Sequence, residues 1–150
     1  MNEIDEIVDN FDFLEDWDAR YHYLIELGEA LPLMPANLKH HENWVKPCMS
    51  TVHVAALPIA NQPRHIRFVG DCDTAIIKGV LALLIDLLSN RTLEEIQGLD
   101  VDALFKRLQL EEHLSPSRHV GIYAIVHKMV ERAEALSRGR TLPPVPEKCP

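Results

Sequence analysis

Apolar and polar positions follow one another along this chain with two periods, one typical of helices and one typical of strands. Near the N-terminus, apolar residues recur at the spacing of an amphipathic helix: Ile4, Ile7, Val8 and Phe11. A second apolar stripe runs through residues 14–27, and Gly28 is placed to end that helix. Two prolines within residues 31–35 exclude a helix interior, so we expect a polar loop over residues 36–43 that carries His40 and His41.

The middle of the chain predicts a β-hairpin followed by a buried helix. Residues 51–57 are rich in β-branched side chains, residues 65–69 alternate polar with apolar, and Asn61-Gln62-Pro63 between them is typical of a turn. Residues 74–88 are apolar on almost every side, which indicates a central helix packed on more than one face. Asp73 is a suitable N-cap for this helix, and a functional role for its carboxylate is an equal alternative.

Further signals complete the predicted fold. Thr92 and Glu95 have the spacing of a capping box, and Pro116 begins a long helix whose apolar face extends to about residue 136. These elements predict an α+β domain in which a small antiparallel sheet packs against helices, and a third strand could join it from residues 37–46 or from elsewhere. We expect one domain over residues 1–137 and a flexible, proline-rich tail over residues 138–150 that contains Cys149.

Composition and charge exclude several classes of function. The net charge of -8 argues against a nucleic-acid-binding surface, which needs clustered lysine and arginine. The longest apolar run, from Val80 to Ile85, is far shorter than the roughly 18 residues of a membrane span. The acidic N-terminus lacks the pattern of a signal peptide, and three widely spaced cysteines do not form a disulfide framework. We therefore expect a protein of the reducing cytoplasm that does not enter a membrane.

Cys48 is the first candidate for chemistry, because a thiol is the one nucleophilic side chain that is partly ionised at neutral pH. Lys46, His53 and the pair His40–His41 are close in sequence, and positive charge near a thiol lowers its pKa. The alternative is that Cys48 is a small, buried and inert residue. Arg118 has the unfavourable charge for the first turn of a helix, so it either meets a carboxylate or is solvated.

Three motifs, taken in chain order, resemble the signatures of one known family. Residues 45–52 contain Val-x-x-Cys-x-Ser-x-Val, residues 70–79 read Gly-Asp-Cys-Asp-Thr-Ala-Ile-Ile-Lys-Gly, and residues 114–121 contain Leu-Ser-Pro-Ser-Arg-x-x-Gly. They are similar to the Val-x-Gly-Cys-x-Ser-x-Val-Trp, Gly-Asp-Ser-Asp-Ala-x-Ile-Val-Lys-Gly and Leu-Ser-Pro-Ser-Arg-x-Asn-Gly segments of the SufE family. The stretch from Tyr21 to Pro32 also fits, and order and spacing agree from about Phe11 to Leu136.

The resemblance implies a sulfur-transfer protein of iron–sulfur cluster assembly. Cys48 would accept a persulfide sulfur from a cysteine desulfurase, stimulate that enzyme and pass the sulfur to an iron–sulfur cluster scaffold. Pyridoxal phosphate belongs to the desulfurase, so we expect no cofactor or metal in this chain, which would be an accessory carrier rather than a stand-alone enzyme. The remaining site positions, supporting or partner-contacting, are Asp73, Arg118, Ser50, His53 and Cys72. We also expect a monomer or a weak homodimer.

A persulfide needs shelter, whereas burial disfavours a thiolate, so we expect a loop that moves Cys48 between a sheltered and an exposed pose. Four positions depart from the family pattern. Pro47 replaces a glycine and removes its positive-φ freedom, and Val120 replaces an asparagine. His53 replaces a tryptophan and either assists Cys48 or packs on the strand, and Cys72 replaces a serine and adds a thiol that could pair with Cys48.

Two other functions stay open at this point. One is a binding module of the same fold that regulates a desulfurase without carrying sulfur. The other is a thiol-dependent or zinc-dependent enzyme that uses Cys48, Cys72 and a histidine.

Overall fold

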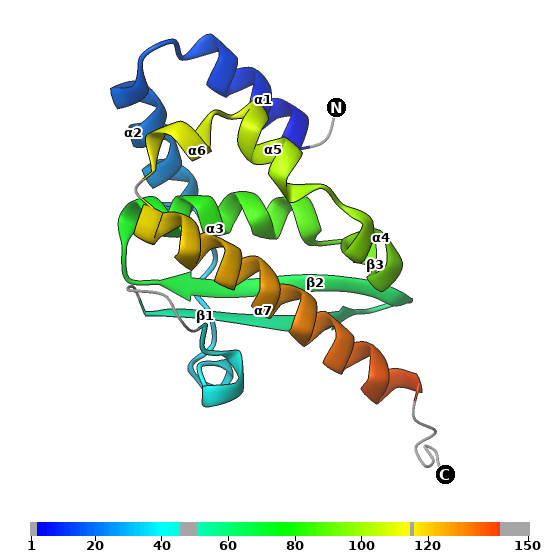
Figure 1. Ribbon diagram of the computed structural model, residues 1–150. Helices are drawn as coiled ribbons and strands as arrows, with labels where there is room; N and C mark the ends of the chain where they lie inside the picture. The colour runs from blue at the N-terminus through cyan, green and yellow to red at the C-terminus, as the bar shows by residue number, and fades with distance from the viewer. Residues whose placement is uncertain (1–2, 46–50, 115, 142–150) are drawn as a thin grey trace.

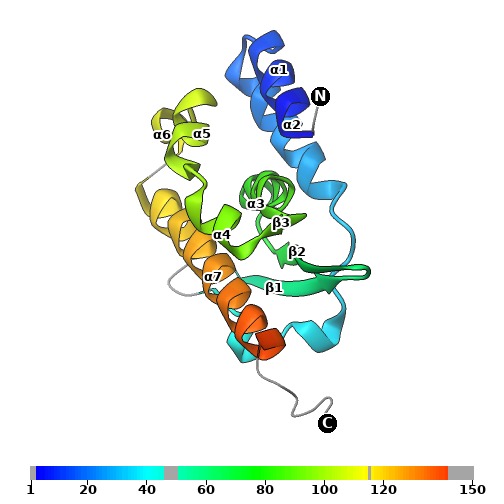
Figure 2. The same cartoon turned by 90° about the vertical axis from the view of Figure 1, so that its right-hand side faces the viewer.

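The fold is an α+β arrangement in which one buried helix separates a small sheet from a pair of N-terminal helices. The computed structural model describes residues 3–45, 51–114 and 116–141. Helices α1 (Glu3–Phe13) and α2 (Trp17–Glu29) are followed by two short 3-10 turns, η1 (Ala36–Leu38) and η2 (His41–Asn43). Figures 1 and 2 show α3 (Ala75–Leu88) lying between the sheet and the pair α1–α2. The predicted fold class is confirmed.

The hairpin is longer than the sequence predicted. Strand β1 (Val52–Ile59) pairs antiparallel with β2 (Gln62–Cys72), and the chain reverses at Ala60 and Asn61, whose φ of 67° is left-handed. The predicted turn at 61–63 was therefore placed too late in the chain. The prediction ended one strand before Pro58 and began the other after Pro63. In the structure both prolines lie in the strands, where the ladder is irregular: the register shifts between Pro58 and Ile59, opposite the part of β2 that contains Pro63. Such positions tolerate proline because they do not use its missing N–H.

A third strand completes the sheet from an unexpected part of the chain. Strand β3 (Arg91–Thr92) pairs with residues 65–66 of β2, giving the order β1-β2-β3. The region 37–46 contributes only an isolated bridge between Trp44 and His53, on the other edge of β1, as far as the structure describes it. Two residues carry too little periodicity for a strand to be predicted, so β3 was missed.

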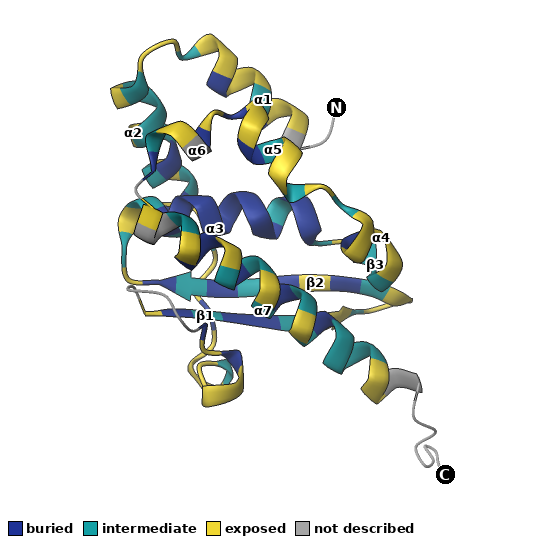
Figure 3. Ribbon diagram, viewed as in Figure 1, coloured by how far each residue is buried: buried dark blue, intermediate teal, exposed yellow. Residues whose placement is uncertain are grey.

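Helix α3 is the centre of the core. Burial covers most of its length (Figure 3), and its buried residues include Val80, Leu81, Leu83, Leu84 and Leu88. The long helix α7 (Pro116–Thr141) crosses the sheet in front of it and starts where Pro116 predicted (Figure 1). Helix α7 continues past the expected end near residue 136, so the proposed domain boundary at residue 137 falls inside a helix.

Gly28 does not end α2, as the sequence suggested, but lies inside it against α3. A Cβ atom on Gly28 would lie 2.9 Å from the backbone nitrogen of Gly79, and one on Gly79 would overlap the carbonyl oxygen of Leu24. Both glycines are therefore needed for the close approach of α2 and α3 rather than for a turn.

The connection between α3 and α7 contains three short helices: α4 (Leu93–Gly98), α5 (Val101–Arg107) and α6 (Leu110–His113). The predicted capping box is confirmed, because the Thr92 hydroxyl accepts from Glu95 N while the Glu95 carboxylate accepts from Thr92 N. Within the described residues, no helix is both long enough and apolar enough to cross a membrane.

Candidate functional site around the ends of the Cys48 segment

The segment that contains Cys48 begins and ends at two residues that are hydrogen-bonded to each other. Val45 N donates to Val52 O at 2.9 Å, and both side chains are fully buried. One residue further out, Trp44 bridges to His53. Residues 46–50 lie outside the described residues, so the predictions for Pro47, Cys48 and Ser50, and for a moving loop, stay predictions. The two anchored ends nevertheless fix where this segment leaves and rejoins the fold.

Asp73 holds the C-terminal end of that segment. Its Oδ1 atom accepts a hydrogen bond from Thr51 N at 3.0 Å, and its own N–H donates to Thr51 O at 3.2 Å. The hydroxyl of Thr74 also donates to Asp73 Oδ1, at 3.3 Å. The N-cap interpretation of Asp73 is wrong, because the N-cap of α3 is Thr74. The carboxylate instead joins the start of α3 to the residue that follows the Cys48 segment.

The first turn of α3 has no side-chain cap from Thr74. Thr74 makes no capping hydrogen bond, and Asp73 directs its carboxylate to Thr51 and to the Thr74 hydroxyl. The N–H groups of a first helical turn carry partial positive charge and stabilise anions placed near them. Because Thr51 is tied to Asp73, this positive end of a 14-residue helix adjoins the end of the Cys48 segment.

The N-terminus of α7 lies at the same end of the hairpin. Figure 1 shows α3 and α7 both starting at the end of the sheet at which β2 ends, and Figure 2 shows α7 set to one side of α3. Arg118 is in the first turn of α7, as predicted, and its side chain lies outside what the structure describes. Val120 is exposed, so the loss of the family's asparagine there places an apolar group at the surface. The described parts of the three motifs therefore lie at the same end of the sheet.

Cys72 is buried in the turn that joins β2 to α3. Its exposed fraction is 6%, it faces Val52 in the strand register, and its sulfur belongs to the core. Thr74 N donates to Cys72 Sγ at 3.4 Å, and the thiol donates to Thr74 O at 3.6 Å. This geometry gives Cys72 a packing and turn-forming role, whereas its pairing with Cys48 stays an untested prediction.

His53 lies between Trp44 and Asp71, its two neighbours across the strands. Partial burial lowers its pKa from the ordinary 6.5, and the positive charge of Lys39 lowers it further, against a smaller opposing effect of Asp71. The imidazole is therefore neutral at neutral pH. His53 does not supply the positive charge near Cys48 that the sequence suggested.

Two lysines pair with Asp71, the residue opposite His53 in the strand register. Asp71 binds Lys39 Nζ from the η1–η2 loop at 2.7 Å and Lys78 Nζ from α3 at 3.4 Å. Partial burial alone would raise the pKa of Asp71, but the hydrogen bond from Lys39, a backbone hydrogen bond from Cys72 and the charges of both lysines outweigh it and lower the pKa. The carboxylate thus stays ionised and ties the loop to the sheet and to α3. Sequence reasoning missed this group, because Lys39 lies in a polar loop without periodicity.

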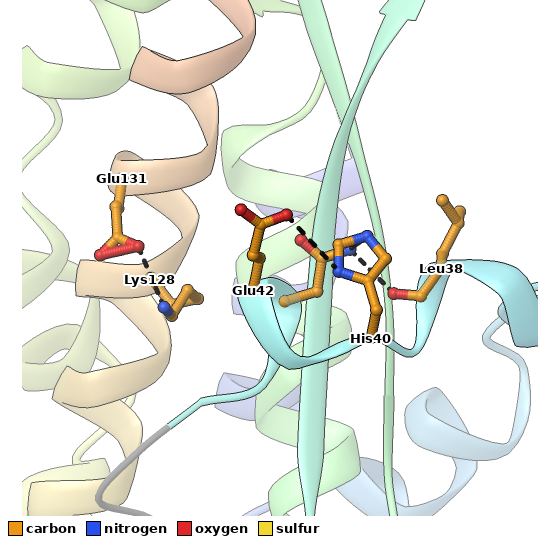
Figure 4. A network of polar contacts seen from close by, with 6 residues as sticks. Leu38, His40, Glu42, Lys128 and Glu131 are labelled. Atoms are coloured by element: carbon orange, nitrogen blue, oxygen red, sulfur yellow. Dashed lines mark hydrogen bonds and ion pairs between the residues drawn. The ribbon is translucent and has the colours of Figure 1, made fainter.

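A polar network also fixes the path of the chain into Trp44 (Figure 4). Asn43 is 3% exposed, and its Nδ2 group donates to Leu38 O at 2.8 Å and to His40 Nε2 at 3.2 Å. On the other side, His40 Nδ1 lies 4.0 Å from Glu42 Oε1. Asn43 was not singled out from the sequence, where asparagine in a polar loop is ordinary. Among the described residues no group of three His, Cys, Asp or Glu side chains could hold a metal ion.

The fold and this anchored segment define a small α+β protein whose chain carries a cysteine in the segment that connects η2 to β1. A family model described as "SufE: Fe-S metabolism associated domain" matches residues 5–133. The chain therefore belongs to the SufE family, which links it to iron–sulfur metabolism and to the handling of sulfur for iron–sulfur clusters.

Two relatives agree with this assignment, and one solved structure shares the fold. An uncharacterized SufE-like protein of Rhizobium meliloti is 35% identical over 136 residues, which cover 89% of this chain and 96% of that one. A second, from Rhizobium etli, is 36% identical over 135 residues, covering 89% and 91%. The solution structure of a hypothetical protein from Thermus thermophilus superposes with a TM-score of 0.71 at 18% identity, over 90% of this chain and 96% of that one. This last likeness concerns the fold alone.

Proposed function

We propose that the protein accepts sulfane sulfur on Cys48 from a cysteine desulfurase, stimulates that enzyme, and delivers the sulfur to an iron–sulfur cluster scaffold. The observation that supports this most is the pair of hydrogen bonds between Asp73 and Thr51, which ties the end of the Cys48 segment to the start of α3. The proposal also rests on family membership. The protein works in the reducing cytoplasm, as a monomer or weak homodimer.

Sulfur moves in two exchange steps that need no oxidant. The Cys48 thiolate attacks the outer sulfur of the desulfurase persulfide, the donor S–S bond breaks, and the desulfurase cysteine leaves as a thiolate. Cys48 then carries a persulfide. A thiolate of the receiving protein attacks its outer sulfur, and Cys48 leaves as a thiolate in turn. The chain has no cofactor of its own in this scheme, since pyridoxal phosphate generates the donor persulfide in the partner.

The surroundings of the segment suit an anion that is both nucleophile and leaving group. The first turn of α3, where Thr74 makes no side-chain capping bond, carries the partial positive charge of a helix N-terminus, while His53 stays neutral and the charges of Lys39 and Lys78 are paired with Asp71. Positive potential lowers the pKa of a nearby thiol, which raises the thiolate fraction and improves the leaving group. We propose that Asp73 and Arg118 orient the Cys48 segment or contact the desulfurase.

Intact-mass measurement after incubation with a desulfurase and free cysteine tests the proposal. We expect one added sulfur, about 32 Da, on the wild-type chain, retained by Cys72→Ser and lost by Cys48→Ser. Turnover of the desulfurase that is stimulated equally by Cys48→Ala, without any adduct on the wild type, would instead establish a regulatory binding module. Stoichiometric zinc, or hydrolysis without a partner, would establish an independent enzyme.

A further inference from the structure

Helix α2 contacts α3 and the end of α6, the short helix that precedes α7. On one side it packs on α3 through Gly28 and Gly79, so closely that a Cβ on Gly79 would overlap the carbonyl of Leu24. On the other side it contacts the end of α6, just before α7 begins. A rigid helix that touches both elements can fix the distance between them.

The contact with α6 is made by two aromatic residues on α2. The Tyr21 hydroxyl donates to the carbonyl oxygen of His113 at 2.6 Å. The Trp17 ring stacks on the His113 imidazole with a centroid distance of 3.7 Å and an interplanar angle of 15°. His113 is the last residue of α6, three residues before Pro116 opens α7. Both contacts therefore act on the backbone that leads into α7.

This junction depends on such contacts, because α6 is too short to hold its own end. The helix has four residues, and Leu114 after it is already extended, with φ of -119° and ψ of 145°. His113 Nδ1 lies 3.0 Å from Gln109 O, Arg20 on α2 donates to Gln109 Oε1 at 3.3 Å, and Leu114 is buried in the core, but none of these contacts binds the His113 carbonyl. The Tyr21 bond is the described hydrogen bond that joins this carbonyl to a distant, firmly packed helix.

We infer that Tyr21 is a positioning residue for sulfur transfer: through His113 it sets the start of α7, and hence Arg118, relative to Asp73 at the start of α3. The inference rests on the proposed function, because it assumes that Arg118 acts at the site. Misplacing a reacting or orienting group by about 1 Å can slow a reaction by up to about a hundredfold. Loss of a single hydroxyl can therefore slow transfer without unfolding the protein.

The variant Tyr21→Phe removes this one hydrogen bond and keeps the ring. Its matched control is Tyr23→Phe on the same helix, which removes the bond that the Tyr23 hydroxyl accepts from Asn10 Nδ2 at 2.9 Å. We expect Tyr21→Phe to lower the rate constant of persulfide formation at saturating desulfurase by about fivefold to tenfold, and Tyr23→Phe to leave it within about twofold. Equal rates in the two variants would overturn the inference.

A double-mutant cycle separates positioning from a general loss of stability. If Tyr21 acts through Arg118, then Tyr21→Phe combined with Arg118→Ala will transfer sulfur no more slowly than Arg118→Ala alone. A purely structural role of Tyr21 would give independent, multiplying effects and would overturn the inference.

Amide NMR shifts distinguish this failure from a failure of the proposed function. They should move at Val120 and Gly121 in Tyr21→Phe but not in Tyr23→Phe, and this readout involves no sulfur. If the shifts move in this way while the wild-type chain gains no sulfur from the desulfurase, the proposed function alone is contradicted. Unchanged shifts at Val120 and Gly121 would overturn the inference.

Discussion

Asp73 and Thr51 are hydrogen-bonded in both directions, with the Asp73 carboxylate 3.0 Å from Thr51 N and Asp73 N 3.2 Å from Thr51 O. The first residue after the Cys48 segment is thereby fixed to the first turn of α3. A carboxylate that could have capped the helix is used on the neighbouring segment, and the N-cap residue Thr74 makes no side-chain capping bond. We interpret the use of Asp73 on Thr51, rather than on the helix, as the feature that holds the N-terminus of α3 beside Thr51, the residue that follows the Cys48 segment.

Replacing Asp73 by alanine removes the acceptor for Thr51 N. We expect Asp73→Ala to slow persulfide formation by at least about tenfold while lowering stability by only about 1–3 kcal/mol, since the exposed carboxylate loses its hydrogen bonds from Thr51 N and from the Thr74 hydroxyl. Asp73→Asn keeps an oxygen acceptor and should retain most of the rate. Stopped reactions analysed by mass, together with urea unfolding, measure both quantities. If Asp73→Ala forms the persulfide at the wild-type rate, the hydrogen bond between Asp73 and Thr51 has no role in sulfur transfer.

The packing of α2 on α3 predicts a strong difference between two glycine substitutions. Gly79→Ala places a Cβ atom into the Leu24 carbonyl, so we expect a loss of more than about 3 kcal/mol in the free energy of unfolding. Gly139→Ala in α7 is the control, because nothing lies within 4 Å of its Cβ position and alanine favours a helix by about 1 kcal/mol. Denaturant unfolding of both variants measures this. A stable Gly79→Ala variant would contradict the described helix contact.

The lowered pKa of His53 predicts an acid-sensitive contribution to stability. In the folded state the imidazole binds a proton less readily than in the unfolded chain, whose ordinary pKa is 6.5. The unfolded state therefore takes up the proton first, and this group destabilises the fold progressively as pH falls below about 6.5. Above that pH it contributes nothing. His53→Gln should flatten the fall in stability between about pH 7 and pH 5, and an NMR titration midpoint of His53 at or above 6.5 would contradict the prediction.

Cys72 should be unreactive in the folded protein. At 6% exposure, with its thiol hydrogen-bonded to Thr74, it is shielded from alkylating reagents. We expect iodoacetamide to modify Cys72 only after denaturation, and Cys72→Ser to fold and to transfer sulfur at the wild-type rate. Peptide mapping of the alkylated native protein measures this directly. Rapid native labelling of Cys72 would reopen its role as a second reactive thiol.

Elements with strong local signals could be predicted from the sequence. The apolar run of residues 74–88 predicted the central buried helix that is α3, Pro116 predicted the start of α7, and Thr92 with Glu95 predicted a capping box. In each case the physical cause is local, within one or two helical turns. The predicted elements and their order along the chain were therefore sufficient to predict the α+β fold class.

Features that depend on distant contacts could not be predicted in this way. Gly28 looked like a helix terminator until the approach of Gly79 gave it a packing role. Asp73 looked like a cap, because nothing in the sequence placed Thr51 N within its reach. Lys39 and Asn43 lie in a loop without periodicity, and their partners are set by tertiary structure or by irregular turns. The candidate site is made mostly of contacts between residues distant in the sequence, so the sequence predicted only some of its residues.

The most direct test locates the transferred sulfur on one peptide. Because trypsin does not cleave before proline, a non-reducing digest yields residues 40–64 with Cys48 and residues 68–78 with Cys72 as separate peptides. After incubation with a desulfurase and cysteine, we predict one extra sulfur on the peptide 40–64 and none on 68–78. Extra sulfur on 68–78 alone, or on neither peptide, would contradict the assignment of Cys48 as the acceptor.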